Sequence, residues 1–225
     1  MNNNTVSEFP KTSVEKENYA VVLAGGDGSR LKSLTRMIAG DERPKQFCPI
    51  LGNETLLDVT RRRAALKISS DNTFFSLKAK HERIYREILA GVAAEKLIVQ
   101  PENKGTAPAI LYSLLHLEKF SPNATVAFFP SDHYFSDDKA FMENVERAFR
   151  AVEINPDSVV LLGIEPDSAE TSYGWIEPVE SLFDTAAGAV SRVKRFWEKP
   201  SFESANYLLK KGCLWNSFVM VGKVF

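Results

Sequence analysis

The chain has 225 residues, and its 28 lysines and arginines nearly balance its 29 aspartates and glutamates, which gives a formal net charge of −1 at pH 7. A chain of this length typically forms one domain, and the even balance argues against a general nucleic-acid binder or an anionic-membrane binder, because both need an excess of basic residues. The longest stretch without Asp, Glu, Lys or Arg, 105–117, is shorter than the ~20 apolar residues of a membrane-spanning helix.

The N-terminal segment, residues 1–18, is polar and lacks the apolar stretch of a signal peptide. We expect it to be a disordered tail, because it could not bury enough surface to offset the entropy lost on ordering. The tail would precede a single domain of residues 19–225. The only two cysteines, Cys48 and Cys213, are too few for a disulfide framework or a cysteine-based zinc site and are typical of a reducing cytoplasm.

The next part of the chain alternates between apolar strand patterns and helical patterns. The sequence predicts strands at 19–24, 73–77, 97–100, 125–129 and 158–164, and helices at 55–67, 81–91, 106–120 and 138–152. Thr106 is the expected N-cap of the third helix, with Pro108 in its first turn. Such alternation predicts an α/β fold with a doubly wound, mostly parallel sheet.

The alternation of strand and helix patterns ends after Ser168. Strand patterns at 173–179, 190–197 and 214–221, with a short helix at 202–211, predict a small mixed or antiparallel extension covering the open mouth of the sheet. Doubly wound sheets bind ligands at the carboxyl ends of their strands. The segments that follow the predicted strands are therefore where binding residues are expected.

The first such segment is LAGGDGSRL, residues 23–31. Gly25, Gly26 and Gly28 would let backbone N–H groups approach a phosphate, although their spacing matches neither a Walker A loop nor a GxGxxG motif. Five cations follow within a short distance: Arg30, Lys32, Arg36, Arg43 and Lys45. Such a cluster suits a polyphosphate. A glycine-rich turn followed by a solvated charged loop explains the segment equally well.

Two further segments place polar residues at strand ends. In FFPSDH, a buried strand would hold Asp132 rigidly enough to bind a metal ion, unless that side chain merely caps the following turn; His133 is expected to be an orienting or structural hydrogen-bond partner. In QPENKGTAPAI, Gln100 could read a base edge and Gly105 permits close approach of a flat ring. A capped helix after a turn explains Thr106 but not Gln100.

The aromatic segments YGWIEP, RFWEKP and LWNS bring tryptophan, tyrosine, carboxylate and lysine together. This mixture suits a sugar phosphate, because aromatic faces pack on C–H surfaces while charged groups bind hydroxyls and phosphate. Each tryptophan taken singly is more typical of a hydrophobic core.

Eight segments cover the chain from Tyr19 to its end, in this order: LAGGDGSRL, LTR, RPKQF, NKGTAPAI, FFPSDH, YGWIE, FWEKP and WNS. Their order and spacing resemble the sugar-1-phosphate nucleotidyltransferases, and RPKQF, GTAPAI and PSDH resemble the mannose-1-phosphate guanylyltransferase branch. The resemblance implies a Rossmann-like fold and a cytoplasmic enzyme that makes GDP-mannose and pyrophosphate from GTP and mannose 1-phosphate, with Mg²⁺ as cofactor.

The resemblance also implies roles for individual residues. Arg30, Lys45 and Asp132 would be catalytic, with the two cations countering phosphate charge and Asp132 holding Mg²⁺. The nucleotide would be bound by Leu23, Ala24, Gly25, Gly26, Gly28, Arg30, Gln100, Gly105 and Thr106, with guanine at Gln100 and Gly105. Mannose 1-phosphate would be bound by Gly174, Glu198, Lys199 and Asn216.

The chain departs from the family at three points. Ser33 stands where the family usually has proline, and Phe218 stands where WNS is usually followed by glycine. The family also carries a second metal-binding aspartate after WNS, whereas the last aspartate here is Asp184, so we expect the sequence to be incomplete at its C-terminus. A non-catalytic nucleotide-binding relative, and a transferase for another sugar or nucleotide, stay open as alternatives, as does assembly into a homo-oligomer.

Overall fold

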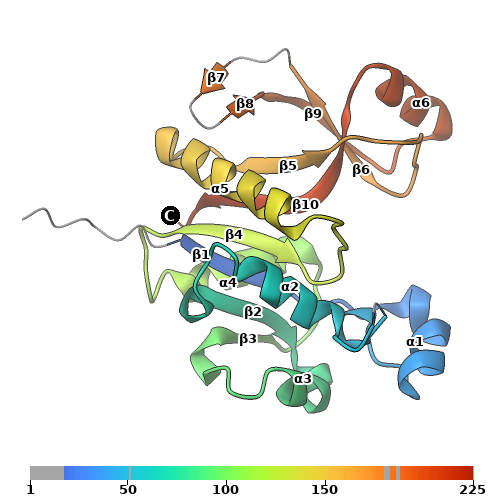
Figure 1. Ribbon diagram of the computed structural model, residues 1–225, viewed down its shortest axis with the longest axis vertical. Coiled ribbons are helices and arrows are strands. Elements are labelled where there is room, and N and C mark those ends of the chain that lie inside the picture. Colours follow the sequence, from blue (N-terminus) through green and yellow to red (C-terminus); the bar gives the residue numbers. More distant parts are fainter. Residues whose placement is uncertain (1–17, 51, 180–182, 186–187, 225) are drawn as a thin grey trace, which may run out of the picture.

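The computed structural model describes residues 18–50, 52–179, 183–185 and 188–224. Its main sheet contains β1 (Asn18–Leu23), β2 (Thr73–Lys78), β3 (Leu97–Gln100), β4 (Thr125–Pro130), β5 (Val160–Ile164), β6 (Gly174–Pro178), β9 (Val193–Glu198) and β10 (Leu214–Lys223). The spatial order is β3-β2-β1-β4-β10-β6-β9, and β5 pairs with β10 (Figure 1). A separate hairpin joins β7 (Phe183–Thr185) to β8 (Gly188–Val190).

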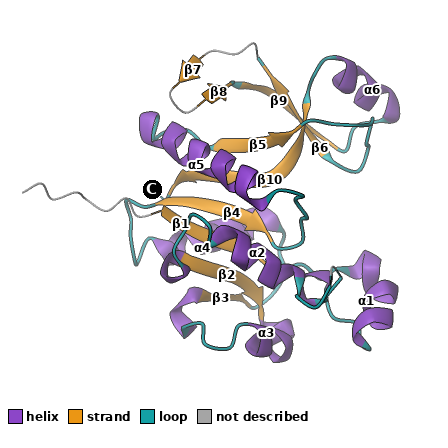
Figure 2. Ribbon diagram, in the orientation of Figure 1, coloured by secondary structure: helices purple, strands orange, loops and turns teal. Residues whose placement is uncertain are grey.

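Helices cover both faces of the sheet, as expected for a doubly wound fold (Figure 2). The α-helices of the described chain are α1 (Lys32–Ala39), which lies to one side of the sheet, α2 (Leu56–Ala64), α3 (Glu82–Ile88), α4 (Thr106–Leu117), α5 (Asp138–Ile154) and α6 (Phe202–Lys210). On one face, α2 and α5 pack over the central strands, with Ala64 and Phe149 in a cluster with Phe129. On the other face, Leu117 of α4 packs in a cluster with Val21.

The central strand β1 explains why its sequence is continuously apolar. Ala20, Val21 and Val22 are fully buried, because both faces of this strand are covered. Strand β1 pairs in parallel with β2 on one side and with β4 on the other. The carboxyl ends of these three strands therefore meet at one edge, where the cavity described below opens.

Strand directions confirm the predicted α/β fold and refine its extension. Strands β1 to β6 of the main sheet run in one direction, and β9 and β10 run against them. The predicted extension is mixed and antiparallel, but β10 does not cover the mouth of the sheet as expected. It pairs antiparallel with β4 and so continues the main sheet.

Most predicted elements are present, and the differences have local causes. Thr106 is not the N-cap of α4: Gly105 takes that position with φ +98°, and no side chain caps the helix. Helix α1 and the β7–β8 hairpin were not predicted, because they are short: α1 has eight residues and each hairpin strand has three. The expected tail, residues 1–17, lies outside the described residues, while Asn18 begins β1 and does not belong to a tail.

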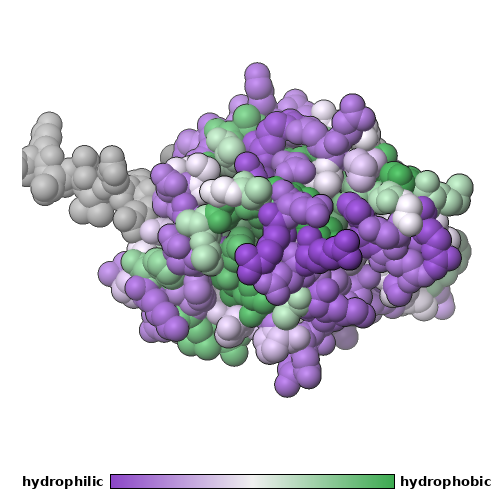
Figure 3. All heavy atoms as spheres, turned by 90° about the horizontal axis from the view of Figure 1, so that it is seen from below, coloured by the Kyte–Doolittle hydropathy of each residue, from purple (hydrophilic) through white to green (hydrophobic). Residues whose placement is uncertain are grey.

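No helix in the described part of the chain is long and apolar enough to cross a membrane. Figure 3 shows one face of the molecule, on which hydrophilic residues predominate and hydrophobic residues form patches between them.

Candidate active site

A cavity of about 790 Å³ lies at the carboxyl ends of the parallel strands, where the rule for doubly wound sheets places ligands. Its lining combines the glycine-rich segment, polar residues within or just after β2, β3 and β4, and two aromatic side chains. The lining residues with predicted roles are Leu23, Gly25, Gly26, Gly28, Arg30, Lys45, Gln100, Gly105, Thr106 and Asp132. Ala24, which was also predicted, is fully buried beneath the loop.

The conformation of the glycine-rich loop is fixed by close packing and by the side-chain amide of one buried glutamine. The side-chain amide of Gln46 donates to the carbonyl oxygens of Ala24 at 2.9 Å and Gly26 at 2.8 Å. Gly28 has φ +59°, and a Cβ there would lie 3.0 Å from the backbone nitrogen of Lys45. A residue without a side chain is therefore needed at this position.

Only two of the five predicted cations line the cavity. Lys32 and Arg36 both pair with Glu42, and Arg43 pairs with Asp41 at 2.7 Å. Arg30 lines the cavity and forms no ion pair or side-chain hydrogen bond among the described residues. The predicted five-cation cluster is thus wrong in extent, because acidic residues on the same segment neutralise three of its members.

A carboxylate at the edge of the cavity is also neutralised. Lys78, at the end of β2, donates to the two carboxylate oxygens of Asp27 at 2.7 and 2.9 Å. This hydrogen bond holds the pKa of Asp27 below its usual range, and His81 lies 3.6 Å from the same carboxylate. Because Lys45 is itself paired with Asp132, Arg30 is the cavity-lining cation without an acidic partner among the described residues.

Asp132 follows β4 and meets Lys45 across the cavity, with 2.5 Å between the ammonium nitrogen and a carboxylate oxygen. The ring of His133 lies 3.7 Å from the other carboxylate oxygen. Burial lowers the pKa of His133 in spite of that carboxylate, and a hydrogen bond with the backbone of Ser217 works in the opposite direction. The role predicted for His133, an orienting or structural hydrogen-bond partner, stays a prediction, because its ring is near Asp132 but too far for a hydrogen bond to that carboxylate.

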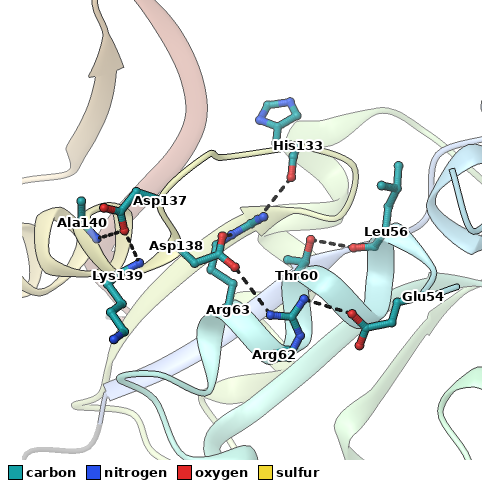
Figure 4. Close-up of polar contacts among 10 residues, drawn as sticks. All are labelled: Glu54, Leu56, Thr60, Arg62, Arg63, His133, Asp137, Asp138, Lys139 and Ala140. Carbon is teal, nitrogen blue, oxygen red and sulfur yellow. Dashed lines mark hydrogen bonds and ion pairs between the residues drawn. The ribbon is translucent and has the colours of Figure 1, made fainter. Parts of the chain in front are cut away.

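A buried arginine supports the loop that carries Asp132 (Figure 4). Arg63 of α2 is 2% exposed; it donates to Asp138 at 2.5 Å and to the carbonyl oxygen of His133 at 3.2 Å. Its guanidinium also lies over the ring of Phe135, 4.8 Å from the centroid. These contacts tie α2 to the start of α5 and fix the backbone next to Asp132.

The side of the cavity near β3 carries the residues predicted to read a base. The amide of Gln100 is buried and donates to the hydroxyl of Ser76 at 2.9 Å. The backbone N–H of Gly105 donates to the side chain of Asn103 at 3.0 Å. This hydrogen bond orders the turn before α4, whose first N–H groups have no side-chain cap.

The four residues predicted to bind mannose 1-phosphate lie beside the cavity and are absent from its described lining. Gly174 pairs with Glu198 across β6 and β9, and the ammonium of Lys199 lies 3.3 Å from Glu198. Asn216 of β10 accepts a hydrogen bond from the backbone of Phe218. Their neighbours Ser172, Tyr173 and Phe218 line the cavity instead.

Sequence reasoning missed several residues of this site: Gln46, Lys78, Asn103 and Ser172. Lys78 could have been found, because it directly follows a predicted strand and therefore lies at the same sheet edge. The role of Gln46 had no such signal, since it depends on contacts with a loop that is distant in the sequence.

The described residues contain no group of three His, Cys, Asp or Glu side chains that could hold a metal ion by themselves. Asp132 is the only carboxylate among the described residues lining the cavity. Mg²⁺ is usually bound by one or two carboxylates together with substrate phosphates. The donor set therefore fits an ion shared with a bound nucleotide.

Comparison with known proteins identifies relatives for nearly the whole described chain. Residues 19–223 match the family model described as nucleotidyl transferase. The chain is 32% identical over 200 residues to xanthan biosynthesis protein XanB of Xanthomonas campestris pv. campestris, and 32% identical over 204 residues to mannose-1-phosphate guanylyltransferase of Escherichia coli K12. Each alignment covers 88% of this chain but only 40% and 41% of the relative, so the chain spans about two fifths of their length.

A solved structure from Thermus thermophilus, described as mannose-1-phosphate geranyltransferase, superimposes with a TM-score of 0.81 at 32% identity. The superposition covers 92% of this chain and 58% of that one. The same α/β architecture is therefore present in a protein of similar sequence.

Proposed function

Because the chain belongs to the nucleotidyl transferase family, we propose that its cavity binds GTP and mannose 1-phosphate. In the proposed reaction, a phosphate oxygen of mannose 1-phosphate attacks the α-phosphorus of GTP, and the bond from that phosphorus to the oxygen bridging the β-phosphate breaks. The products are GDP-mannose and pyrophosphate. The similarity to the guanylyltransferase of Escherichia coli supports this choice of substrates.

One observation carries the proposal: the glycine-rich loop, Arg30, Lys45 and Asp132 all line a single cavity. A transfer between two phosphate-bearing molecules needs alignment and neutralisation of charge more than it needs a covalent nucleophile. Backbone N–H groups of the loop, and two cations, supply both. The side near Gln100 leaves room for a base whose edge could replace the hydroxyl of Ser76 as hydrogen-bond partner.

The pair formed by Lys45 and Asp132 has a defined role in this proposal. Without ligand, the two groups neutralise each other at 2.5 Å. With GTP bound, Lys45 would pair with a phosphate oxygen, and the freed carboxylate of Asp132 would be available to hold Mg²⁺. The ion, when bound, would screen the repulsion between the two phosphate groups. Arg30 stabilises the charge that develops on the transferred and leaving phosphates.

A cytoplasmic location is part of the same proposal. Cys48 and Cys213 are free and buried, and burial raises the pKa of both thiols. Unpaired thiols are typical of a reducing compartment, where nucleoside triphosphates are also available.

The test measures pyrophosphate release by the 225-residue chain from GTP and mannose 1-phosphate, with other nucleotides and sugar phosphates as a panel. We expect Arg30→Ala to abolish release and to weaken GTP binding. Arg36→Ala is the matched control, because Arg36 belongs to the same segment but pairs with Glu42 outside the cavity. GTP binding without pyrophosphate release would favour a non-catalytic relative. Equal losses of pyrophosphate release in Arg30→Ala and Arg36→Ala would contradict the role proposed for Arg30.

A further inference from the structure

Two non-glycine residues of the described chain have left-handed backbone conformations: Lys199 with φ +44° and Phe218 with φ +62°. Such conformations cost free energy for residues with a Cβ, and for a bulky residue they are rare. They persist where the surroundings enforce them, and they concentrate at ligand sites. Both residues here belong to the segments next to the candidate sugar-phosphate side of the cavity.

The conformation of Phe218 is fixed by the two residues before it. The side chain of Asn216 accepts the backbone N–H of Phe218 at 3.0 Å. The hydroxyl of Ser217 donates to the carbonyl oxygen of Leu162 at 2.6 Å and accepts the N–H of Val219 at 3.1 Å. The pairing of β10 with β5 shifts register between Asn216 and Met220. The strand is therefore built with an irregularity at Phe218.

The effect of this irregularity is that Phe218 lines the cavity. Its side chain is about one third exposed, although it belongs to a strand whose neighbours Ser217 and Val219 are buried. Tyr173 lines the same cavity; Trp215 packs edge-on against its ring at 5.2 Å, and the N–H of Lys199 donates to its carbonyl oxygen at 3.3 Å. We call Tyr173 and Phe218 the aromatic wall. Both strained residues therefore contribute to this wall.

We propose that Phe218 is a specificity-determining residue, whose ring restricts the acceptor to hexose 1-phosphates without bulky substituents. This inference rests on the proposed function. The wall comes from β10 and the segment before β6, whereas the charged groups and Gln100 come from the segments after β1 to β4. With phosphates and base on those segments, the sugar is the part of the substrates left to meet the wall. The ring offers a flat apolar face to sugar C–H groups and fills space that a larger substituent would need.

The test compares Phe218→Gly and Phe218→Ala with the unmodified chain. Phe218→Ala removes the ring but keeps the Cβ, whereas Phe218→Gly removes both. The measurement is kcat/KM for mannose 1-phosphate and for N-acetylglucosamine 1-phosphate, together with GTP affinity. Phe202→Ala is the matched control, because Phe202 is an exposed aromatic residue of α6 away from the cavity lining.

We expect both variants to shift the ratio of kcat/KM values toward the bulkier acceptor by about 10-fold or more. Removing a side chain from a substrate pocket typically changes the ratio of kcat/KM values for two substrates by at least this factor. GTP affinity and the Phe202→Ala ratio should not change. We also expect Phe218→Gly to unfold at a higher temperature than Phe218→Ala, because the change to glycine relieves the backbone strain. The two melting transitions also show that both variants are folded.

An unchanged acceptor ratio in folded variants would overturn the inference, and so would a loss confined to GTP affinity. Neither result would affect the proposed function, because the unmodified chain would still transfer the nucleotide. If the unmodified chain neither binds nor turns over mannose 1-phosphate with GTP, the proposed function fails, and this inference fails with it.

Discussion

The ammonium nitrogen of Lys45 lies 2.5 Å from a carboxylate oxygen of Asp132, so a residue of the loop before α2 neutralises the residue that follows β4. The contact links the glycine-rich side of the cavity to the side expected to hold Mg²⁺. A ligand that brings phosphates and a divalent ion would give each member of this pair a new partner. The ion pair is thus the point at which the two halves of the candidate site depend on each other.

Removing the charge of Asp132 tests this dependence. We expect Asp132→Asn to lower kcat for pyrophosphate release by ~10²–10³-fold, the order that losing one charge-stabilising group typically costs. Folding should be unaffected, since the carboxylate is 24% exposed and the amide is of similar size. Steady-state kinetics and circular dichroism measure the two quantities. A folded variant that keeps near-normal turnover would contradict the role proposed for Asp132.

The strand ends could be predicted from the sequence because two rules act locally. Apolar runs such as the one at β1 identify buried strands, and parallel strands present their carboxyl ends at one edge. Those rules placed Gln100 and Asp132 in the right region, although they lie on different strands. The pattern of β10 was equally clear, but its partner was not, because strand pairing is a tertiary choice that periodicity does not encode.

For the charged residues, the sequence does not predict which side chains line the cavity. Lys45 and Arg43 look alike in the sequence, yet only Lys45 lines the cavity while Arg43 pairs with Asp41. The difference depends on the course of the chain between α1 and α2. The same limit applies to Phe218, whose departure from glycine was visible but whose backbone conformation was not.

The buried arginine beneath the Asp132 loop should matter more for stability than its surface neighbour. We expect Arg63→Met to lower the free energy of unfolding by ~3–5 kcal/mol, because it leaves the carboxylate of Asp138 without its buried partner. Arg62→Met is the matched control: Arg62 is exposed and pairs with Glu54 at 3.0 Å and only distantly with Asp138, at 3.9 Å, so its loss should cost less than about 1 kcal/mol. Urea unfolding measures both. Similar values for the two variants would show that Arg63 does not stabilise this region.

A carboxylate beneath α6 predicts how stability depends on pH. Hydrogen bonds from Lys211, Trp197 and Lys194 lower the pKa of Glu177 from 4.5 to about 2. Because the pKa in the folded state is below the unfolded value, this group stabilises the fold fully above about pH 4.5 and loses its contribution as the pH falls toward 2.

The variant Glu177→Gln should therefore melt below the unmodified chain at pH 7, and the difference should shrink as the pH is lowered from about 4.5 toward 2. Melting temperatures at several pH values measure this. Glu146, whose pKa is also lowered to about 2 but by Lys67 and Arg150 at the surface, gives a comparison: Glu146→Gln should show the same trend with a smaller amplitude, because solvent screens exposed ion pairs. A difference for Glu177→Gln that does not change with pH would mean that packing, rather than charge, accounts for its effect.

Two glycines with the same backbone conformation separate strain from function in the glycine-rich loop. Gly28 has φ +59° and Gly40 has φ +78°, so alanine at either position should cost roughly 1–2 kcal/mol of stability. A Cβ at Gly40 meets nothing within 4 Å, whereas one at Gly28 would lie 3.0 Å from the backbone nitrogen of Lys45 and push that residue away from the cavity.

We therefore expect both variants to lose stability through backbone strain, Gly28→Ala to lose more because of its close contact with Lys45, and only Gly28→Ala to weaken GTP binding. Thermal unfolding and calorimetric titration with GTP measure the two effects on the same samples. If both variants bind GTP as the unmodified chain does, the close packing of the loop on Lys45 has no part in holding the phosphates. If both lose binding equally, the loss follows from strain in general, and the position of Lys45 is not what the loop controls.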